Sequence, residues 1–465
     1  MKNLKLYTLG MSLVAVPALN IHAKVECPNI ILINIDDLGW TDLSCNGSKY
    51  YETPNIDRLR KAGLWFSQAY AGSANSAPSR ACMLTGQYTP RHGMYTVGNP
   101  NRGKAKLRKF IAIPNREVLP EGIQLLPQVL HDHGYQTFHV GKWHVTENPL
   151  VCGMDVNVAG NHAGHPHGYF SPYHNGNLRN GKEGEFLPDR LGNEAVSLVR
   201  NADRSRPFFL YYATYAVHTP LQAEPELIEK YKRKHHTDAH FNPVYAALVE
   251  AMDRNVGKVL QAVCDNKLEE NTIIVFTSDN GGVYDISRQW PLRAGKGSFY
   301  EGGIRVPLVI YQKGVFENHD FLDVPVSQLD LFPTLLDLAG ISAKKRLLDG
   351  KSLVKLLKRK HDSQLDERPL FWHFPAYLEG GNRETTDKYF RTRPVSVIRK
   401  GDWKLIENYE TGKYELYNLS MDVSEREELS LLYPKILKKL SNQLNRWKET
   451  IHAPIPQLLN PDYDN

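Results

Sequence analysis

Cysteine is scarce in this 465-residue sequence, and its spacing follows no pattern. The chain has five cysteines, an odd number, at positions 27, 45, 82, 152 and 264. They allow two disulfides at most, and no pair has the short spacing of a metal-binding finger. The sequence therefore excludes a disulfide-rich scaffold and a cysteine-based zinc site as defining features.

A long hydrophobic run is also missing. The apolar stretch at residues 6–19 is short for a bilayer span, and it follows the positive charges of Lys2 and Lys5. Together with the small side chain of Ala23, this pattern is typical of a cleaved secretory signal peptide, which we assign to residues 1–23. We therefore expect an exported protein, periplasmic or secreted, with no membrane span in the mature chain.

A strong charge of either sign is absent as well. The formal net charge is +6 at pH 7, and loss of Lys2 and Lys5 with the signal would leave +4. This mildly basic balance suits an anionic substrate, but it is far from that of a nucleic-acid-binding protein. Two basic runs, at residues 102–109 and 230–236, are either solvated surface, which we favour, or a rim that attracts sulfated polymers.

Repeats and low-complexity segments are lacking, and the chain instead alternates two kinds of pattern. Apolar runs typical of buried parallel strands cover residues 29–35, 136–140, 207–215, 271–276 and 306–311. Helical patterns cover residues 55–62, 125–133, 189–200, 246–265 and 329–338. This alternation predicts an α/β fold with a large, mostly parallel sheet between layers of helices.

The pattern changes near residue 371. Residues 394–406 and 413–419 alternate apolar and polar side chains as antiparallel strands do, and residues 435–451 have the pattern of an amphipathic helix. We therefore expect a large α/β domain over residues 24–370. A smaller α+β domain, with an antiparallel sheet and a terminal helix, is expected over residues 371–465.

Polar side chains follow four of the predicted strands at the point where each strand ends. They are Asp36 and Asp37, Lys142 and His144, His218, and Asp279 and Asn280. Because ligands of parallel α/β sheets bind outside the carboxyl ends of the strands, we expect these side chains to converge on one site.

The acidic members of this set suggest a metal site. Asp36, Asp37, Asp279 and Asn280 offer hard oxygen ligands, which suit Ca²⁺ or Mg²⁺ better than zinc. Each pair alone is also compatible with an ordinary turn, since Asp and Asn favour turns. Their position at the ends of two buried strands favours the metal.

A serine-centred segment lies between the first two predicted strands. In residues 74–86, Pro78 stiffens a loop around Ser76, and Arg80 offers a planar fork of donors to an oxyanion. Met83 and Leu84 are expected to begin a helix. Composition alone would also allow an ordinary serine-rich loop.

Two long motifs carry a resemblance to a known family. Residues 76–86 (SAPSRACMLTG) resemble the first signature of the type I, formylglycine-dependent sulfatases, and residues 134–144 (GYQTFHVGKWH) resemble the second. The resemblance extends from residue 29 to about 419. Asn75 departs from the small or aliphatic residue that the family prefers, and Ser76 stands where other members have cysteine. The family uses both nucleophile forms.

The resemblance implies a fold, a cofactor and a maturation partner. It implies the alkaline phosphatase-like fold and a sulfuric ester hydrolase whose Ser76 becomes formylglycine through an anaerobic sulfatase-maturating enzyme. One Ca²⁺ per site is implied, held by Asp36, Asp37, the modified Ser76, Asp279 and Asn280.

Catalytic roles are implied in the same way for Ser76, Arg80, Lys142, His144, His218 and Lys296. The hydrated aldehyde at position 76 would attack sulfur, and the basic side chains would neutralise the sulfate. His218 would protonate the leaving oxygen, and His144 would take a proton from the second hydroxyl. Asp330 is expected to be a helix cap or a buried hydrogen-bonding group instead.

Substrate-selecting residues have weaker signals. The segment 160–174 is rich in His and Tyr, and it is either a structured loop or a rim that binds sugar hydroxyls. Segments 287–293 and 371–373 are further positions, where Trp290 or Trp372 would stack on a sugar. The substrate-binding residues expected on this basis are His162, His165, His167, Tyr173, Arg293, Trp372 and His373.

The sequence thus predicts an exo-acting carbohydrate sulfatase. By general resemblance, the expected targets are galactose or N-acetylgalactosamine units of host glycans, glycosaminoglycans or algal polysaccharide. One alternative is a phosphatase, phosphodiesterase or phosphonate hydrolase of the same superfamily, against which the lack of ligands for a second metal counts. The other is an inactive carbohydrate-binding relative, against which the intact Ser76, Arg80 and Lys142 count.

Overall fold

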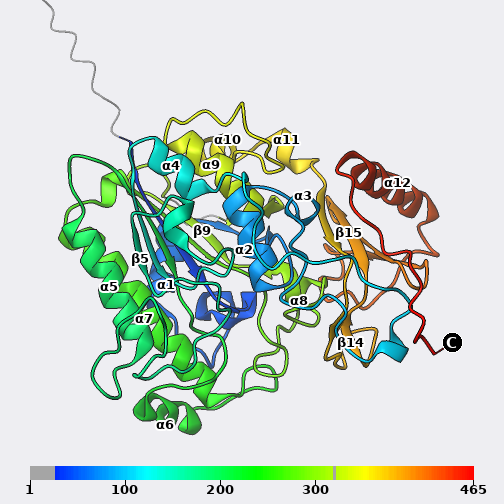
Figure 1. Cartoon of the computed structure of the whole chain (residues 1–465), viewed down its shortest axis with the longest axis horizontal. Coiled ribbons are helices and arrows are strands. Elements are labelled where there is room, and N and C mark those ends of the chain that lie inside the picture. Colours follow the sequence, from blue (N-terminus) through cyan, green and yellow to red (C-terminus); the bar gives the residue numbers. More distant parts are fainter. Residues whose placement is uncertain (1–26, 318–320, 465) are drawn as a thin grey trace, which may run out of the picture.

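The computed structural model describes residues 27–317 and 321–464, so the predicted signal peptide lies outside the described residues. The larger part of the chain is built on an eight-stranded sheet in the order β10-β2-β9-β7-β1-β6-β4-β5 (Figure 1). Its strands are β1 (Asn29–Ile35), β2 (Leu64–Phe66), β4 (Gln136–Gly141), β5 (Val156–Val158), β6 (Phe208–Ala213), β7 (Thr272–Ser278), β9 (Leu308–Tyr311) and β10 (Phe321–Leu322).

The sheet is mostly parallel, as predicted, with β9 as the exception. β9 is antiparallel to both of its neighbours, β7 and β2. The prediction of a parallel strand at residues 306–311 is therefore wrong. The segment that follows β7 stays at the carboxyl edge of the sheet, where Lys296 N–H donates to Gly282 O (2.8 Å) and Gly281 N–H to Gly303 O (3.0 Å). Without a crossover to the other edge, the chain re-enters the sheet in the opposite direction.

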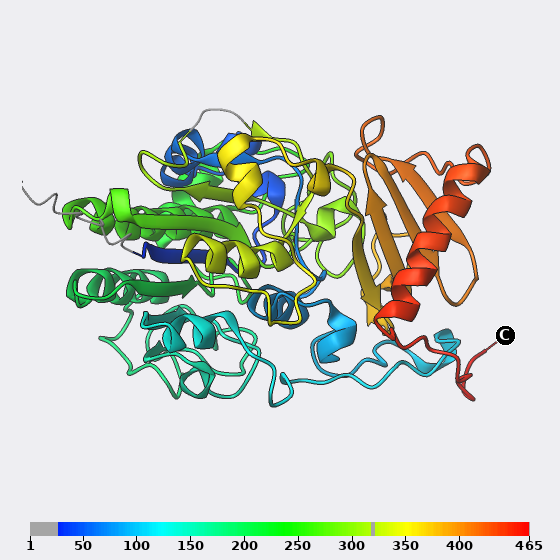
Figure 2. The ribbon, with the colours of Figure 1, turned by 90° about the horizontal axis from the view of Figure 1, so that it is seen from above.

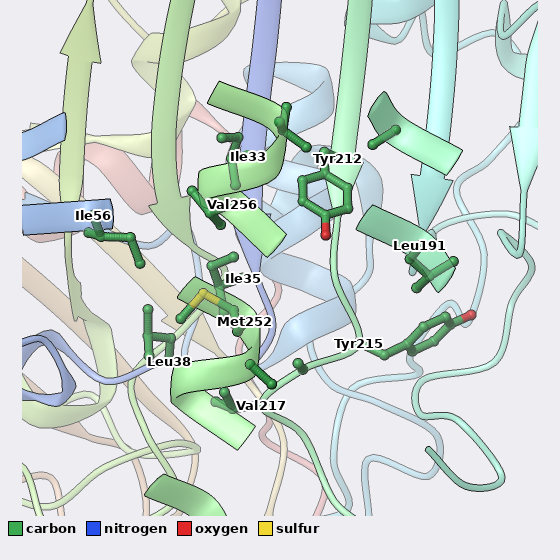
Figure 3. Close-up of a cluster of buried hydrophobic side chains, with 14 of the residues drawn as sticks. Ile33, Ile35, Leu38, Ile56, Leu191, Tyr212, Tyr215, Val217, Met252 and Val256 are labelled. Atoms are coloured by element: carbon green, nitrogen blue, oxygen red, sulfur yellow. The ribbon is translucent and has the colours of Figure 1, made fainter. Parts of the chain in front are cut away.

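Helices cover both faces of this sheet, because successive side chains of β1 point to opposite sides. Ile31, Ile33 and Ile35 pack with α1 (Pro54–Ala62), α5 (Leu187–Asn201) and α7 (Pro243–Asp265). Figure 3 shows part of this cluster, with Ile33 and Ile35 beside Met252 and Val256. Ile30 and Leu32 pack on the other face, with α2 (Ser76–Thr85), α4 (Leu126–Asp132), α9 (Leu331–Leu338) and α10 (Val354–Arg359).

The C-terminal part is a four-stranded antiparallel sheet in the order β12-β15-β16-β17, formed by β12 (Leu370–Phe374), β15 (Val395–Lys400), β16 (Trp403–Asn408) and β17 (Tyr414–Asn418). Figure 2 shows it beside the larger sheet, with α12 (Pro434–Thr450) on its outer side. Phe371 and Leu405 face α12, whereas Trp372 and Val397 pack on the larger part. The predicted fold class is confirmed, and the division at residue 370 stays a prediction.

Short elements complete the fold. Three short strands form a second sheet, β3 (Ala69–Tyr70), β8 (Arg305–Val306) and β11 (Val326–Ser327), and β13 (Leu378–Glu379) pairs with β14 (Phe390–Thr392). The remaining α-helices are α3 (Thr89–His92), α6 (Pro225–Arg233), α8 (Glu301–Ile304) and α11 (Ser363–Asp366). All five cysteines are free thiols. Among the described residues, no helix has both the length and the apolarity that crossing a membrane requires.

Candidate active site

Three carboxylates meet at the carboxyl edge of the large sheet. Asp36 and Asp37 follow β1, Asp279 follows β7, and one oxygen of each lies within 4.8 Å of the others. Asp36 and Asp279 are fully buried, and Asp37 is 2% exposed. Asp37 has a left-handed backbone (φ 60°), which turns its side chain toward the neighbouring strand end. Such a buried set of oxygen donors fits a hard divalent cation.

Ser76 stands beside this triad as the first residue of α2. Its hydroxyl lies 3.3 Å from Asp36 Oδ1 and 3.2 Å from Asn280 Oδ1. The helix was expected to begin at Met83, and this expectation is wrong, because Pro78 lies in the first turn, where its missing N–H costs nothing. The consequence is functional: Ser76 occupies the positive end of a ten-residue helix, which favours an anion.

Each of three basic side chains forms an ion pair with a member of the triad. Lys142 Nζ lies 2.7 Å from Asp36, Lys296 Nζ 2.7 Å from Asp37, and Arg80 Nε 2.8 Å from Asp279. Lys142 and Arg80 are completely buried. Arg80 Nη2 is buried and makes no hydrogen bond to any residue that the structure describes, although it lies 3.5 Å from Asp36. This unused donor of a buried guanidinium points to a missing anionic or oxygen partner.

The pKa values of the triad reflect crowding of negative charge. Burial, together with repulsion from Asp279 and Asp37, raises the pKa of Asp36 to about 8 even though Lys142 opposes this. Burial also acts on Asp37, but the ammonium group of Lys296 outweighs it and lowers the pKa of that carboxyl. A divalent cation would relieve the repulsion among the three groups.

Two histidines flank Ser76 and the triad. His144 follows β4 and is 4% exposed, and its buried Nδ1 has no hydrogen-bond partner in the described part of the chain. His218 places Nε2 3.5 Å from Asp37, while its Nδ1 lies 2.7 Å from Thr219 O. Burial lowers the pKa of both rings, for His218 to about 4, so both are neutral at neutral pH.

These groups open into a cavity of about 560 Å³. The residues from the sequence prediction that line it are Asp37, Ser76, Lys142, His144, His165, His218 and Lys296. Asp36, Arg80, Asp279 and Asn280 lie behind this lining and contact it through the hydrogen bonds and ion pairs described above. The structure therefore brings together all the predicted catalytic and metal residues, and one of the predicted substrate-binding residues.

The other predicted substrate-binding residues do not line the cavity. Trp372 is 2% exposed and donates to Ala71 O, and His373 is buried between Ser396 and Pro454. Both belong to β12, which is covered on both faces, so neither reaches a sugar. Arg293 stacks on Tyr300, and Tyr173 donates to Glu185.

Two further histidines also lie outside the lining. The ring of His162 packs against that of His144 with their centroids 5.9 Å apart, and His167 packs on His174.

The structure adds lining residues that sequence reasoning missed. Arg102, Glu379 and Arg391 also line the cavity, together with Asn75, Val97, Val283 and Leu378. Arg102 belongs to the first basic run, which the favoured interpretation treated as solvated surface. The second run fits that interpretation, since Lys230 on α6 pairs with Glu52 and Glu250 at the surface.

Comparison with known proteins identifies the family. The sulfatase family profile matches residues 28–341, and a profile described as the C-terminal region of N-sulphoglucosamine sulphohydrolase matches residues 295–450. A sulfatase of Formosa agariphila is 35% identical over 92% of this chain and 90% of its own length. Human N-acetylgalactosamine-6-sulfatase is 31% identical, with 93% of this chain and 87% of the human protein covered.

A solved structure agrees in both sequence and fold. The crystal structure of Ps i-CgsB in complex with k-i-k-neocarrahexaose has a TM-score of 0.76 and 32% sequence identity, and the match covers 91% of this chain and 93% of that one. The profile spans more than half of the chain, and the relatives exceed 30% identity over nearly its whole length. This protein is a member of the sulfatase family and a sulfuric ester hydrolase.

Proposed function

We propose that this enzyme removes sulfate from a sulfated carbohydrate, using a formylglycine derived from Ser76 and one bound Ca²⁺. The observation that carries this proposal is the position of Ser76. Its hydroxyl contacts Asp36 and Asn280 at the N-terminus of a buried helix, beside three carboxylates and three cations. An unmodified serine there would form a stable sulfate ester, whereas a hydrated aldehyde releases sulfate by returning to the aldehyde.

The residues at the sheet edge fit the calcium ion. Asp36, Asp37, Asp279 and Asn280 would hold it, together with the modified Ser76, because they supply only oxygen ligands. When bound, the cation would polarise the sulfate and the nucleophile. Its charge would offset those of Asp36 and Asp37, whose partners Lys142 and Lys296 line the cavity.

The basic side chains would then stabilise the sulfate. Lys142 and Lys296 line the cavity next to Ser76, and Arg80 reinforces them from the buried side. They are held in place before substrate arrives, since each is fixed by a carboxylate at 2.7 to 2.8 Å. Preorganised charges of this kind stabilise the charge that develops on the sulfate oxygens in the transition state.

The two histidines would move protons. His144 is neutral and has a free, buried Nδ1, which suits it to accept a proton from the group at position 76. His218 sits at the mouth of the site with its Nε2 toward Asp37. The negative charge of a bound sulfate would raise the pKa of His218, and would allow it to protonate the leaving sugar oxygen.

The proposed substrate is a galactose or N-acetylgalactosamine unit at the end of a sulfated glycan. Support comes from the names of two relatives, an N-acetylgalactosamine-6-sulfatase and a protein crystallised with a neocarrahexaose. The cavity volume of about 560 Å³ also falls within the range of small-ligand sites, roughly 300–1,000 Å³. We further propose that the protein is exported, with its signal peptide cleaved near Ala23. An anaerobic radical enzyme would convert Ser76 to formylglycine.

Desulfation of defined sugars tests this proposal. The enzyme, produced with an anaerobic maturating enzyme, is incubated with singly sulfated mono- and oligosaccharides and with nitrophenyl sulfate and nitrophenyl phosphate. We expect sulfate release from a terminal sulfated galactose or N-acetylgalactosamine, and none from the Ser76→Ala variant. Cleavage of the phosphate alone would contradict the proposed reaction, and cleavage of a polymer but of no short sugar would contradict exo action.

A further inference from the structure

Arg391 differs from the other cations of the active-site cavity: among the described residues no carboxylate forms an ion pair with it, although its charge helps to lower the pKa of Glu379. Arg102 pairs with Glu379 at 2.8 Å, and Lys142 and Lys296 pair with Asp36 and Asp37. Within the described part of the chain, Arg391 makes only long hydrogen bonds to backbone carbonyls, to Gly380 O at 3.3 Å and to Lys296 O at 3.5 Å. Its planar fork of donors is therefore free to bind an oxyanion.

The fold holds Arg391 at this position. The residue lies on β14, which pairs with β13, and its side chain is half-buried. Two glycines with left-handed backbones make room for it. A Cβ at Gly297 (φ +86°) would come within 3.0 Å of Arg391 Cδ, and one at Gly380 (φ +88°) within 3.1 Å of Nε. The guanidinium thus lies against the backbone of Lys296, whose ammonium group faces the reacting sulfate.

The ion pairs of the cavity lining leave Arg391 as the basic side chain that is not held by a carboxylate. Three of the four basic side chains that line the cavity are paired, Arg102 with Glu379, Lys142 with the buried Asp36, and Lys296 with Asp37. The reacting sulfate is bound next to Lys142 and Lys296. The Arg391 guanidinium is then left to bind a second anionic group on the substrate.

We propose that Arg391 forms a subsite for a second anionic group, a sulfate or a carboxylate, on the sugar that is desulfated or on its neighbour. The inference rests on the proposed carbohydrate substrate. It makes the enzyme selective for multiply charged glycans. Arg102 and Glu379 also line the cavity and pair with each other in a bidentate arrangement. The guanidinium of Arg391 is therefore the group that binds the additional negative charge.

Three probes with the same 6-sulfate test the proposal. They are N-acetylgalactosamine 6-sulfate, the 4,6-disulfate, and a disaccharide of a uronic acid linked to N-acetylgalactosamine 6-sulfate. The readout is the ratio of kcat/KM for each dianionic probe to that for the 6-sulfate. The wild type should prefer at least one dianionic probe, and which one it prefers distinguishes sulfate from carboxylate recognition. Arg391→Ala should lower that ratio about tenfold, mainly through KM, and Arg391→Lys should retain part of it.

The control is Arg200→Ala, an exposed arginine at the end of α5 that pairs with Asp265. It should leave both the ratio and the separate kcat/KM values unchanged. An unchanged ratio in Arg391→Ala, or a wild-type ratio of one or below, would overturn the inference. If no probe is cleaved, the proposed substrate fails. In that case calorimetry compares the affinity of the same probes for the unmatured serine forms of the wild type and of Arg391→Ala. Equal affinities would overturn the subsite.

Discussion

At the scale of single residues, the site depends on carboxylates that are stable only with cations around them. Asp36, Asp37 and Asp279 are buried together, and the repulsion among them raises the pKa of Asp36. Lys142, Lys296 and Arg80 offset part of this repulsion. A divalent cation should therefore stabilise the folded protein as well as assist catalysis.

Calcium binding should raise the melting temperature. We expect saturating Ca²⁺ to raise Tm by a few degrees, because a ligand at a hundred times its Kd stabilises the folded state by about 2.7 kcal/mol. Asp37→Asn should reduce the shift, since it removes one ligand charge. The matched control is Asp285→Asn, an exposed aspartate in the segment that follows β7. Differential scanning fluorimetry measures the shift, and equal shifts in both variants would place the ion elsewhere.

His144 should matter for turnover more than for binding. Among the described residues its buried Nδ1 has no hydrogen-bond partner, and His144 lines the same cavity as Ser76. His144→Gln should lower kcat by about 10²–10⁴-fold with a smaller effect on KM, which is typical of the loss of a general base. Steady-state kinetics on the preferred sugar sulfate provide the measurement. A loss confined to KM would instead assign His144 to substrate binding.

The structure places predicted residues in the site when they belong to a linear motif or directly follow a strand. Asp36, Lys142 and Asp279 are of this kind. Arg391 was not predictable, because it comes from a short hairpin strand about a hundred residues beyond Lys296 with no motif around it. Trp372 shows the opposite error: an aromatic residue in the sequence gives no sign of whether both faces of its strand will be covered.

At the scale of elements, the pattern of apolar and polar residues predicted the existence of helices and strands better than it predicted the direction of a strand or the first residue of a helix. The strands at 29–35 and 136–140 match β1 and β4 closely. α7 begins at Pro243, three residues before its predicted start, because proline suits the first helical position and Asn242 accepts from the N–H groups of Val244 and Tyr245. Asp330 was expected to be a helix cap or a buried hydrogen-bonding group, and it is a buried member of a capping box, where it accepts from the Ser327 N–H and pairs with Arg368.

The free energy of unfolding should depend on pH through His373, a buried side chain of β12. Burial lowers the pKa of His373 to about 4, between Ser396 Oγ and Pro454 O. In the unfolded chain His373 takes up a proton near pH 6.5, whereas in the folded protein it does so only near pH 4. Stability is therefore unaffected by His373 above pH 6.5, and the free energy of unfolding falls as the pH drops from 6.5 toward 4. The loss reaches about 2 kcal/mol at pH 5.

Urea unfolding from pH 7 to 4.5 measures this effect. The variant His373→Gln does not titrate and can keep the hydrogen bond to Pro454, so its free energy of unfolding should fall less steeply than that of the wild type. Parallel slopes in the two proteins would show that His373 is not kept neutral by the fold.

At the scale of the whole molecule, a buried ionic cluster links the two parts of the chain. Lys404 of β16 lies 3.1 Å from Glu301 of α8 and 2.8 Å from Glu425, and all three side chains are fully buried. Glu301 follows the segment that carries Lys296, so the C-terminal sheet supports a loop of the active site. Trp372 and Val397 of this sheet also belong to one buried apolar cluster with Phe299 and Tyr300 of the larger part.

Removal of the central cation should destabilise the whole protein. Lys404→Met removes the cation that Glu425 and Glu301 share and leaves Glu301 with Arg305 at 3.5 Å, and it should lower the free energy of unfolding by about 3–5 kcal/mol. Lys400→Met is the matched control, because Lys400 pairs at 3.8 Å with an exposed Glu367 and should contribute less than about 1 kcal/mol. Chemical denaturation compares the two variants. Equal losses would show that the cluster adds no stability at the interface.

The central claim is that Ser76 becomes the nucleophile only after oxidation, and the mass of its peptide tests this most directly. The protein is produced with and without an anaerobic maturating enzyme, and the peptide that contains Ser76 is analysed by mass spectrometry beside a sulfatase assay. We predict that the matured peptide lacks two hydrogen atoms and that activity rises in proportion to the converted fraction. Full sulfatase activity in protein whose Ser76 is entirely unmodified would contradict the account.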